Sequence, residues 1–219
     1  MRKLSFFILV MLLFLSCNSK TATNGNIQNL SNLGSMEIYG NYITPKNGIS
    51  ISSAKKIISQ YLVEYGYKGN VKKSLNIKEI TVEQFWIVNK MQIYSIKLDY
   101  AWLDGIAVIS DENVVGILPG MSSVKVYLSD LNGDRKYEIC MNSCFGSGIL
   151  DRRIYVLDTQ NKKEYLLSKR LETDLYLEIS ETGKLCVYGE DHYMSNNKGS
   201  GRKYIGELLI ENDQLVIVE

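Results

Sequence analysis

The clearest periodic pattern in the chain is an amphipathic stretch at residues 52–66. Apolar side chains recur there at spacings of three and four, which gathers them on one face of a helix: Ala54, Ile57, Ile58, Tyr61, Leu62 and Tyr65. Ser52 or Ser53 can cap the first turn, and Gly66 can end the last one. The pattern therefore predicts one helix that packs a single face against a sheet.

Beyond this helix the hydrophobic period changes to two, which is typical of strands. A first pair of strands is expected at 85–88 and 92–100, on either side of Asn89-Lys90. Short turn signals separate the later runs, which predict strands at 106–109, 114–118, 124–128, 137–141, 153–157, 164–168, 175–179, 184–188, 204–210 and 215–218. The chain is therefore expected to be mostly β, α+β overall: an antiparallel meander or sandwich with one amphipathic helix near residues 52–66.

The domain organisation leaves two alternatives open. A helix followed by strands with a Trp-centred core, at about residues 50–100, is similar to small α+β modules such as PepSY-type domains. This resemblance implies an α+β part before residue 119 and an all-β part after it. The alternative is a single globular domain over 36–219.

The N-terminus has the pattern of an export signal. Positive residues at 2 and 3 precede an apolar run from Leu4 to Leu15, which is shorter than the ~20 residues that span a bilayer. Residues 1–16 are therefore expected to be a signal peptide. Residues 17–35, rich in Asn, Ser, Thr and Gly, then form a flexible tether.

Phe14-Leu15-Ser16-Cys17 resembles the lipobox of bacterial lipoproteins, although Phe14 stands where that family typically has Leu. The resemblance implies cleavage before Cys17, lipidation of Cys17 with chains such as palmitate, and a lipid anchor in the cell envelope. The expected location is the outer membrane, facing the periplasm or the surface. The alternative is an ordinary secretory signal with a chance cysteine.

Charge and cysteine content limit the possible partners and cross-links further. Without Arg2 and Lys3 the 25 basic residues become 23, against 24 acidic residues, so no global field attracts nucleic acid or anionic lipid. Cys140, Cys144 and Cys186 remain beside Cys17. Cys186 could bridge to either of the other two, or all three could stay reduced and buried.

The strongest candidate for a chemical site is the acidic segment 130–138. Oxygen-bearing side chains stand at its first, third, fifth and ninth positions, and calcium prefers six to eight oxygen ligands. The segment resembles the calcium loop of FG-GAP and VCBS-type repeats, which links two strands. The resemblance implies a structural calcium ion with four side-chain ligands and one carbonyl ligand, that of Lys136: Asp130, Asn132, Asp134, Lys136 and Glu138.

One position departs from that family, because Arg135 stands where it usually has glycine. A left-handed backbone there would cost about 1 kcal/mol or more, and the charges of Arg135 and Lys136 would weaken cation binding. The alternative is a metal-free, Asx-rich turn.

Catalytic constellations are weaker. Cys144 or Ser147 could be a nucleophile with His192 as its base, but the sequence context matches no nucleophile motif. Carboxylate pairs could be drawn from Asp104 and Asp111 or from Glu190 and Asp191. No catalytic residue, and no cofactor other than structural calcium, is therefore predicted.

The leading hypothesis is a non-enzymatic envelope lipoprotein. It would bind a protein or glycan partner, with the acidic segment stiffened by calcium, and would not bind nucleic acid. The alternatives are an envelope hydrolase that uses Cys144 or a carboxylate pair, and an immunity or inhibitor protein.

Overall fold

The computed structural model describes residues 33–101, 103–145, 151–169, 173–191 and 201–219. Asn32–Glu219 forms one compact unit. The predicted signal peptide and Cys17 lie outside the described residues. At the end of the predicted tether, Ser35 is already fixed to the compact unit, because its N–H donates to Gly183 O at 3.0 Å. None of the described helices combines the length and the apolar content needed to cross a bilayer.

The N-terminal sheet is antiparallel, in the order β2-β3-β4-β5. It is built from β2 (Asn76–Glu79), β3 (Gln92–Leu98), β4 (Leu103–Ser110) and β5 (Asn113–Leu118). A short 3₁₀ turn, Asp99–Ala101, links β3 to β4. One face of this sheet packs against α2 (Ile51–Glu64) and α3 (Val71–Ser74) through a first hydrophobic core.

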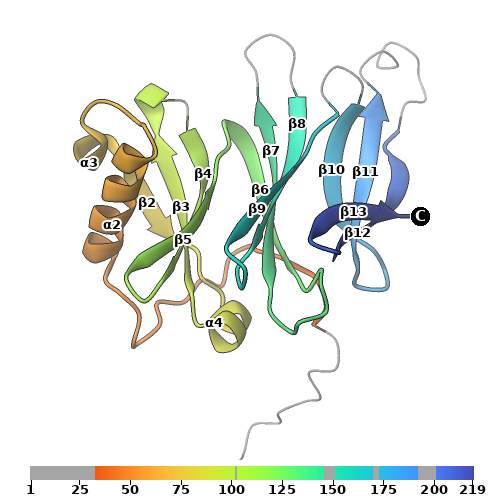
Figure 1. Cartoon of the computed structure of the whole chain (residues 1–219), viewed down its shortest axis with the longest axis horizontal. Helices are drawn as coiled ribbons and strands as arrows, with labels where there is room; N and C mark the ends of the chain where they lie inside the picture. Colours follow the sequence, from red (N-terminus) through yellow and green to blue (C-terminus); the bar gives the residue numbers. More distant parts are fainter. Residues whose placement is uncertain (1–32, 102, 146–150, 170–172, 192–200) are drawn as a thin grey trace, which may run out of the picture. The chain divides into compact units, whose positions relative to one another are not determined.

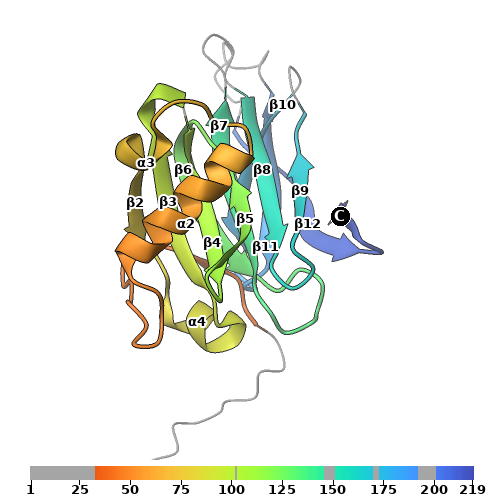
Figure 2. The same cartoon turned by 60° about the vertical axis from the view of Figure 1, so that its left-hand side comes forward.

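The helix predicted at 52–66 is α2, shifted by one or two residues. Its N-cap is Ser50, whose side chain accepts a hydrogen bond from Ser53 N–H, and Gly66 follows its C-cap with φ +105°. The buried residues Ala54, Ile58 and Leu62 lie on the face that the periodicity predicted. In Figure 2 α2 crosses in front of the strands that it covers.

The strand predicted at 85–88 is wrong, because this segment is the helix α4 (Glu83–Asn89). Phe85 is fully buried and Val88 packs against the same core, whereas Ile87 is exposed. The apolar run therefore follows a helical spacing, which four residues are too few to distinguish from a buried strand. Lys90 ends the helix in a left-handed conformation with φ +58°.

The middle sheet has the order β1-β6-β7-β8-β9. It comprises β1 (Met36–Glu37), β6 (Ser122–Ser129), β7 (Glu138–Phe145), β8 (Asp151–Asp158) and β9 (Lys163–Leu167). One face meets the N-terminal sheet in a second hydrophobic core, to which Leu118 contributes from one side and Ile139 from the other. The two parts that could have been separated near residue 119 therefore share a core.

The C-terminal sheet covers the other face of the middle sheet (Figure 1). Its order is β10-β11-β12-β13, with β10 (Thr173–Ile179), β11 (Leu185–Asp191), β12 (Lys203–Glu211) and β13 (Gln214–Val218). All strand pairs in the three sheets are antiparallel. The prediction of a mostly β, antiparallel fold is confirmed, and the sandwich has three stacked sheets with β7 buried on both faces.

Candidate functional site

The acidic segment links β6 to β7, as the FG-GAP resemblance implies, and its polar groups bond to one another. Asp130 Oδ1 accepts from Gly133 N–H at 2.8 Å, and Asp130 Oδ2 accepts from Arg135 N–H at 3.1 Å. Asn132 Oδ1 accepts from Asp134 N–H at 2.9 Å, and Asp134 Oδ1 accepts from Lys136 N–H at 2.7 Å. These successive Asx turns define the loop conformation.

Arg135 adopts the left-handed conformation that a glycine at this position would favour. Its φ is +65°, and Gly133 two positions earlier has φ +76°. Arg135 therefore bears a strain of about 1 kcal/mol that a glycine would not.

Glu138 forms the floor of the loop. Its side chain is fully buried, and Oε2 accepts from Leu131 N–H at 2.6 Å while Oε1 accepts from Asn132 Nδ2 at 3.2 Å. Burial raises the pKa of Glu138 to about 8, although the bond from Leu131 acts in the opposite direction. Burial also raises the pKa of Asp130.

A second set of bonds fastens the end of the loop to α4. Asn89 donates from Nδ2 to Tyr137 O at 2.9 Å and accepts from Tyr137 N–H at 3.1 Å. Its side chain thus bonds to both backbone groups of Tyr137, as a residue of a neighbouring strand does. Asn89 also donates to Thr159 Oγ1 at 2.8 Å. Lys136 Nζ donates to Val88 O at 2.6 Å, in the last turn of α4.

The donor set matches calcium in its chemistry but only partly in its arrangement. Asp130, Asn132 and Asp134 carry oxygens that accept one hydrogen bond each and retain a further lone pair. Glu138 instead accepts hydrogen bonds within the loop through both carboxylate oxygens. Lys136 bonds to α4 through its side chain, whereas its predicted ligand is the backbone carbonyl oxygen. Across the described ranges, no three or more His, Cys, Asp or Glu side chains are gathered closely enough to hold a metal ion.

In the part of the chain that the structure describes, Cys140, Cys144 and Cys186 are free, buried thiols. Cys140 lies in the core between the middle and C-terminal sheets, and burial raises its pKa well above the ordinary value. Cys144 is only 2% exposed, and its Sγ lies 4.0 Å from Phe145 O. Of its predicted companions, Ser147 and His192 lie outside the described residues.

Asp104 and Asp111 do not form a hydrolytic pair. Asp104 is near the start of β4 and Asp111 follows its end, so seven residues of extended chain separate them by about 23 Å. A glycosidase pair needs at most about 9.5 Å. Glu190 lies near Tyr176 and contributes to raising its pKa, whereas the side chain of Asp191 is outside the described part.

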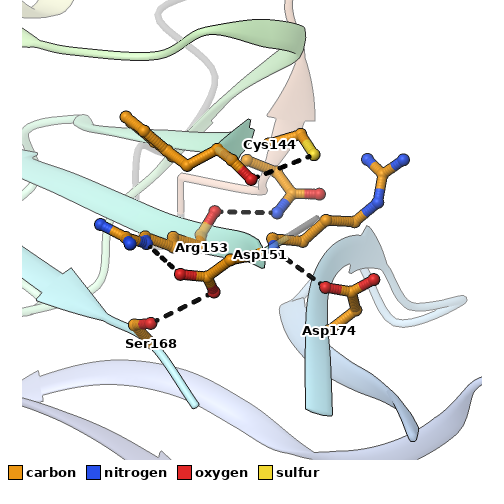
Figure 3. Close-up of polar contacts among 8 residues, drawn as sticks. Cys144, Asp151, Arg153, Ser168 and Asp174 are labelled. Atoms are coloured by element: carbon orange, nitrogen blue, oxygen red, sulfur yellow. Dashed lines mark hydrogen bonds and ion pairs between the residues drawn. The ribbon is translucent and has the colours of Figure 1, made fainter. Parts of the chain in front are cut away.

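A different polar cluster lies where β7 and β8 meet β10 (Figure 3). Asp151 is buried between Arg153 Nε at 2.6 Å and Ser168 Oγ at 3.4 Å. Asp174, at the start of β10, accepts from Arg152 N–H at 2.9 Å.

Two further side chains of the middle sheet hold the free edge of β10. Asn142 donates to Leu175 O at 2.8 Å, and Tyr127 Oη donates to Leu177 O at 2.8 Å. At Leu175 and Leu177 the edge of the C-terminal sheet is therefore fixed on the middle sheet by side chains.

Beside this edge opens a cleft of ≈ 690 Å³, which we call the β10 cleft. Residues of both sheets line it: Glu37, Val124, Lys125, Tyr127, Asn142, Arg152, Tyr176, Leu177, Glu178, Ile179 and Arg202. The guanidinium carbons of Arg202 and Arg152 lie 3.7 and 5.1 Å from the ring centroid of Tyr176. Arg202 pairs with Glu178 at 2.5 Å, and Lys125 lies 3.8 Å from the Glu37 carboxylate.

The sequence did not point to this cleft, because its residues come from segments between 37 and 202 that only strand pairing brings together. Asn142 was the one available signal, since a polar amide inside an apolar strand must find a bonding partner when it is buried.

In comparisons with known proteins, no family model, no curated protein and no solved structure matches the chain. The lipoprotein and FG-GAP resemblances therefore rest on their motifs alone.

Proposed function

We propose that the chain is a lipid-anchored protein of the bacterial cell envelope that binds a protein or glycan partner in the β10 cleft. The observation that carries this proposal is the gathering of Arg152 and Arg202 around the Tyr176 ring, in a cleft between two sheet edges. Binding rather than chemical conversion is the role that these groups support.

The cleft has the properties of a ligand site. Its volume falls in the range of roughly 300–1,000 Å³ that is usual for such pockets, and it combines apolar walls with a few polar groups. Its floor is rigid, because Asn142 and Tyr127 fasten β10. Its ion pairs, by contrast, are partly exposed and therefore weak. A ligand can therefore displace one partner of such a pair with little loss of free energy.

Structural calcium on the acidic loop is the second part of the proposal. Asp130, Asn132 and Asp134 would be side-chain ligands, with Lys136 O as a carbonyl ligand. Glu138 would join them only after its bond with Asn132 is exchanged for the metal. The ion would supply no chemistry there; it would stiffen the connection between β6 and β7.

The anchor is the third part, and the lipobox-like motif at Cys17 supports it. Labelled palmitate should be incorporated into the full chain in a bacterial host and lost in Cys17→Ser. Equal labelling of both chains would contradict the anchor without affecting the cleft.

The decisive experiment concerns the cleft. The purified chain is screened against glycan arrays and envelope extracts, and each ligand found is tested with Tyr176→Ala. Tyr188→Ala is a matched control, because Tyr188 is paired with Tyr176 on the neighbouring strand but does not line the cleft. We expect Tyr176→Ala to weaken binding at least tenfold and Tyr188→Ala to leave it unchanged. Equal effects of the two variants would contradict the cleft as the binding site.

A further inference from the structure

The helical layer, which we define as residues 51–74 with α2 and α3, concentrates positive charge. It contains one acidic residue, Glu64, and five lysines: Lys55, Lys56, Lys68, Lys72 and Lys73. The whole chain has 25 basic and 24 acidic residues. The near-zero net charge of the whole chain therefore includes one strongly basic layer of the fold.

The charge of this layer faces solvent. Four of the five lysines are exposed, and Lys55 is half-buried. Among the described residues, no ion pair engages any of the five. The positive charges are therefore available to an external partner.

Aromatic and apolar side chains accompany the lysines. Tyr65 is 67% exposed and stacks on Tyr61 with ring centroids 6.0 Å apart. Val63 is 54% exposed on the same helix, and Tyr100 lies beside the layer with its hydroxyl donating to Lys68 O at 2.7 Å. Tyrosine rings with a polar tip are enriched where membrane meets water.

We propose that the helical layer docks on an anionic lipid bilayer. Lysines near such a surface are attracted by its negative potential, and the exposed rings suit the headgroup region. The apolar face of α2 is buried against the N-terminal sheet, so α2 lies on the bilayer without inserting. Exposed Val63 and Tyr65, together with the expected anchor at Cys17, favour lipid over nucleic acid as the partner.

Vesicle binding tests this inference. The probe protein is residues 18–219, which keeps the compact unit Asn32–Glu219 whole and lacks the leader and the lipidated cysteine. It is sedimented with vesicles of phosphatidylcholine alone or mixed with phosphatidylglycerol, at low and high salt. We expect binding to the anionic vesicles only, and weaker binding as salt rises. Equal binding to neutral vesicles would overturn the proposal.

Two quadruple variants with equal charge loss locate the surface. The test variant is Lys55→Gln, Lys56→Gln, Lys72→Gln and Lys73→Gln, and the control is Lys97→Gln, Lys125→Gln, Lys163→Gln and Lys184→Gln. We expect the vesicle affinity of the test variant to fall roughly tenfold or more. The vesicle affinity of the control should fall by less than about a third of that factor. Equal losses would assign binding to net charge rather than to the helical layer. Circular dichroism verifies that both variants fold.

Tyr65→Ser separates lipid from other polyanions. We expect it to weaken vesicle binding several-fold while leaving binding to duplex DNA, if any, unchanged. Unchanged vesicle binding together with DNA binding of similar strength would identify a general polyanion surface and overturn the lipid assignment.

Discussion

The acidic loop and the β10 cleft are both polar regions that adjoin β7, yet their polar groups are satisfied in opposite ways. In the loop, each carboxylate accepts hydrogen bonds from nearby backbone or side-chain groups, and Glu138 is fully buried. In the cleft, Arg202 and Glu178 retain 45% and 42% of their side-chain exposure. The loop is bound to itself, whereas the cleft keeps charged groups in contact with water.

This difference teaches that a run of polar residues close in sequence is not by itself a binding site. Short-range polar residues can satisfy one another, and in doing so they fix the fold. Residues brought together from distant strands retain bonding capacity that a ligand can use. Stability should therefore depend on the loop, and ligand binding on the cleft.

The largest expected effect is the pH dependence caused by Glu138. Its folded pKa of about 8 lies above the ordinary value of 4.5, so its contribution is complete below about pH 4.5 and is lost as pH rises through 8. The loss should approach roughly 5 kcal/mol of unfolding free energy. Urea unfolding at a series of pH values measures it. Glu138→Gln should flatten the profile, and an unchanged profile in that variant would assign the effect elsewhere.

Asn89→Ala should cost about 2–3 kcal/mol, because it leaves the buried Tyr137 N–H without its acceptor. Asn113→Ala is the control, since Asn113 bonds only to a turn carbonyl at the surface and should change stability by less than about 0.5 kcal/mol. Urea unfolding of both chains makes the comparison. Similar losses would show that the attachment of α4 is not what supports the loop.

Arg135→Gly should stabilise the chain by about 0.5–1 kcal/mol, because it relieves the left-handed backbone at φ +65°. Arg135→Ala removes the same charge without relieving the backbone and should not stabilise. Calorimetric titration with calcium extends the test: if the loop binds the ion, Arg135→Gly should bind it more tightly than the parent chain. If neither calcium nor chelator changes the melting temperature of either chain, the loop is a metal-free turn.

The smallest effect on stability is expected in the cleft. Arg152→Gln removes a cation–π contact at a partly exposed site and should cost less than about 1 kcal/mol. The same variant should lower the affinity of the cleft for its ligand. A loss of stability as large as that of Asn89→Ala would remove the distinction between the two regions.

Much of the fold could be predicted because alternating side chains mark strands that are buried on one face. The run 124–128, for example, lies within β6, and 175–179 lies within β10. Prediction failed where local pattern carries little information. The run at Phe85 is a helix because its four apolar residues follow a helical spacing, which such a short run does not reveal. β2 was missed because Asn76–Glu79 contains a single apolar residue.

The two candidate sites also differ in how far local sequence pattern could predict them. The loop is contiguous, so its position between two strands followed from residue order. The left-handed conformation of Arg135, which the sequence raised only as a condition, is seen in the structure. The cleft requires the packing of β10 against β7 and β8 to bring Tyr176 to Arg152. One sequence gives strand positions but not which sheets will face each other.

The two-residue strand β1 has a consequence for self-association. It pairs with Tyr127 and Leu128 of the eight-residue β6, and Ile38 N–H donates to Val126 O beside it. Further along, β6 carries a bulge between Ser122 and Lys125 where it pairs with β7. Irregular, charged edges resist pairing with strands of other molecules. Copies held on a bilayer by the proposed anchor would collide in two dimensions at high local concentration. The bulge and the Lys125–Glu37 pair would then keep neighbouring copies from joining their sheets into aggregates.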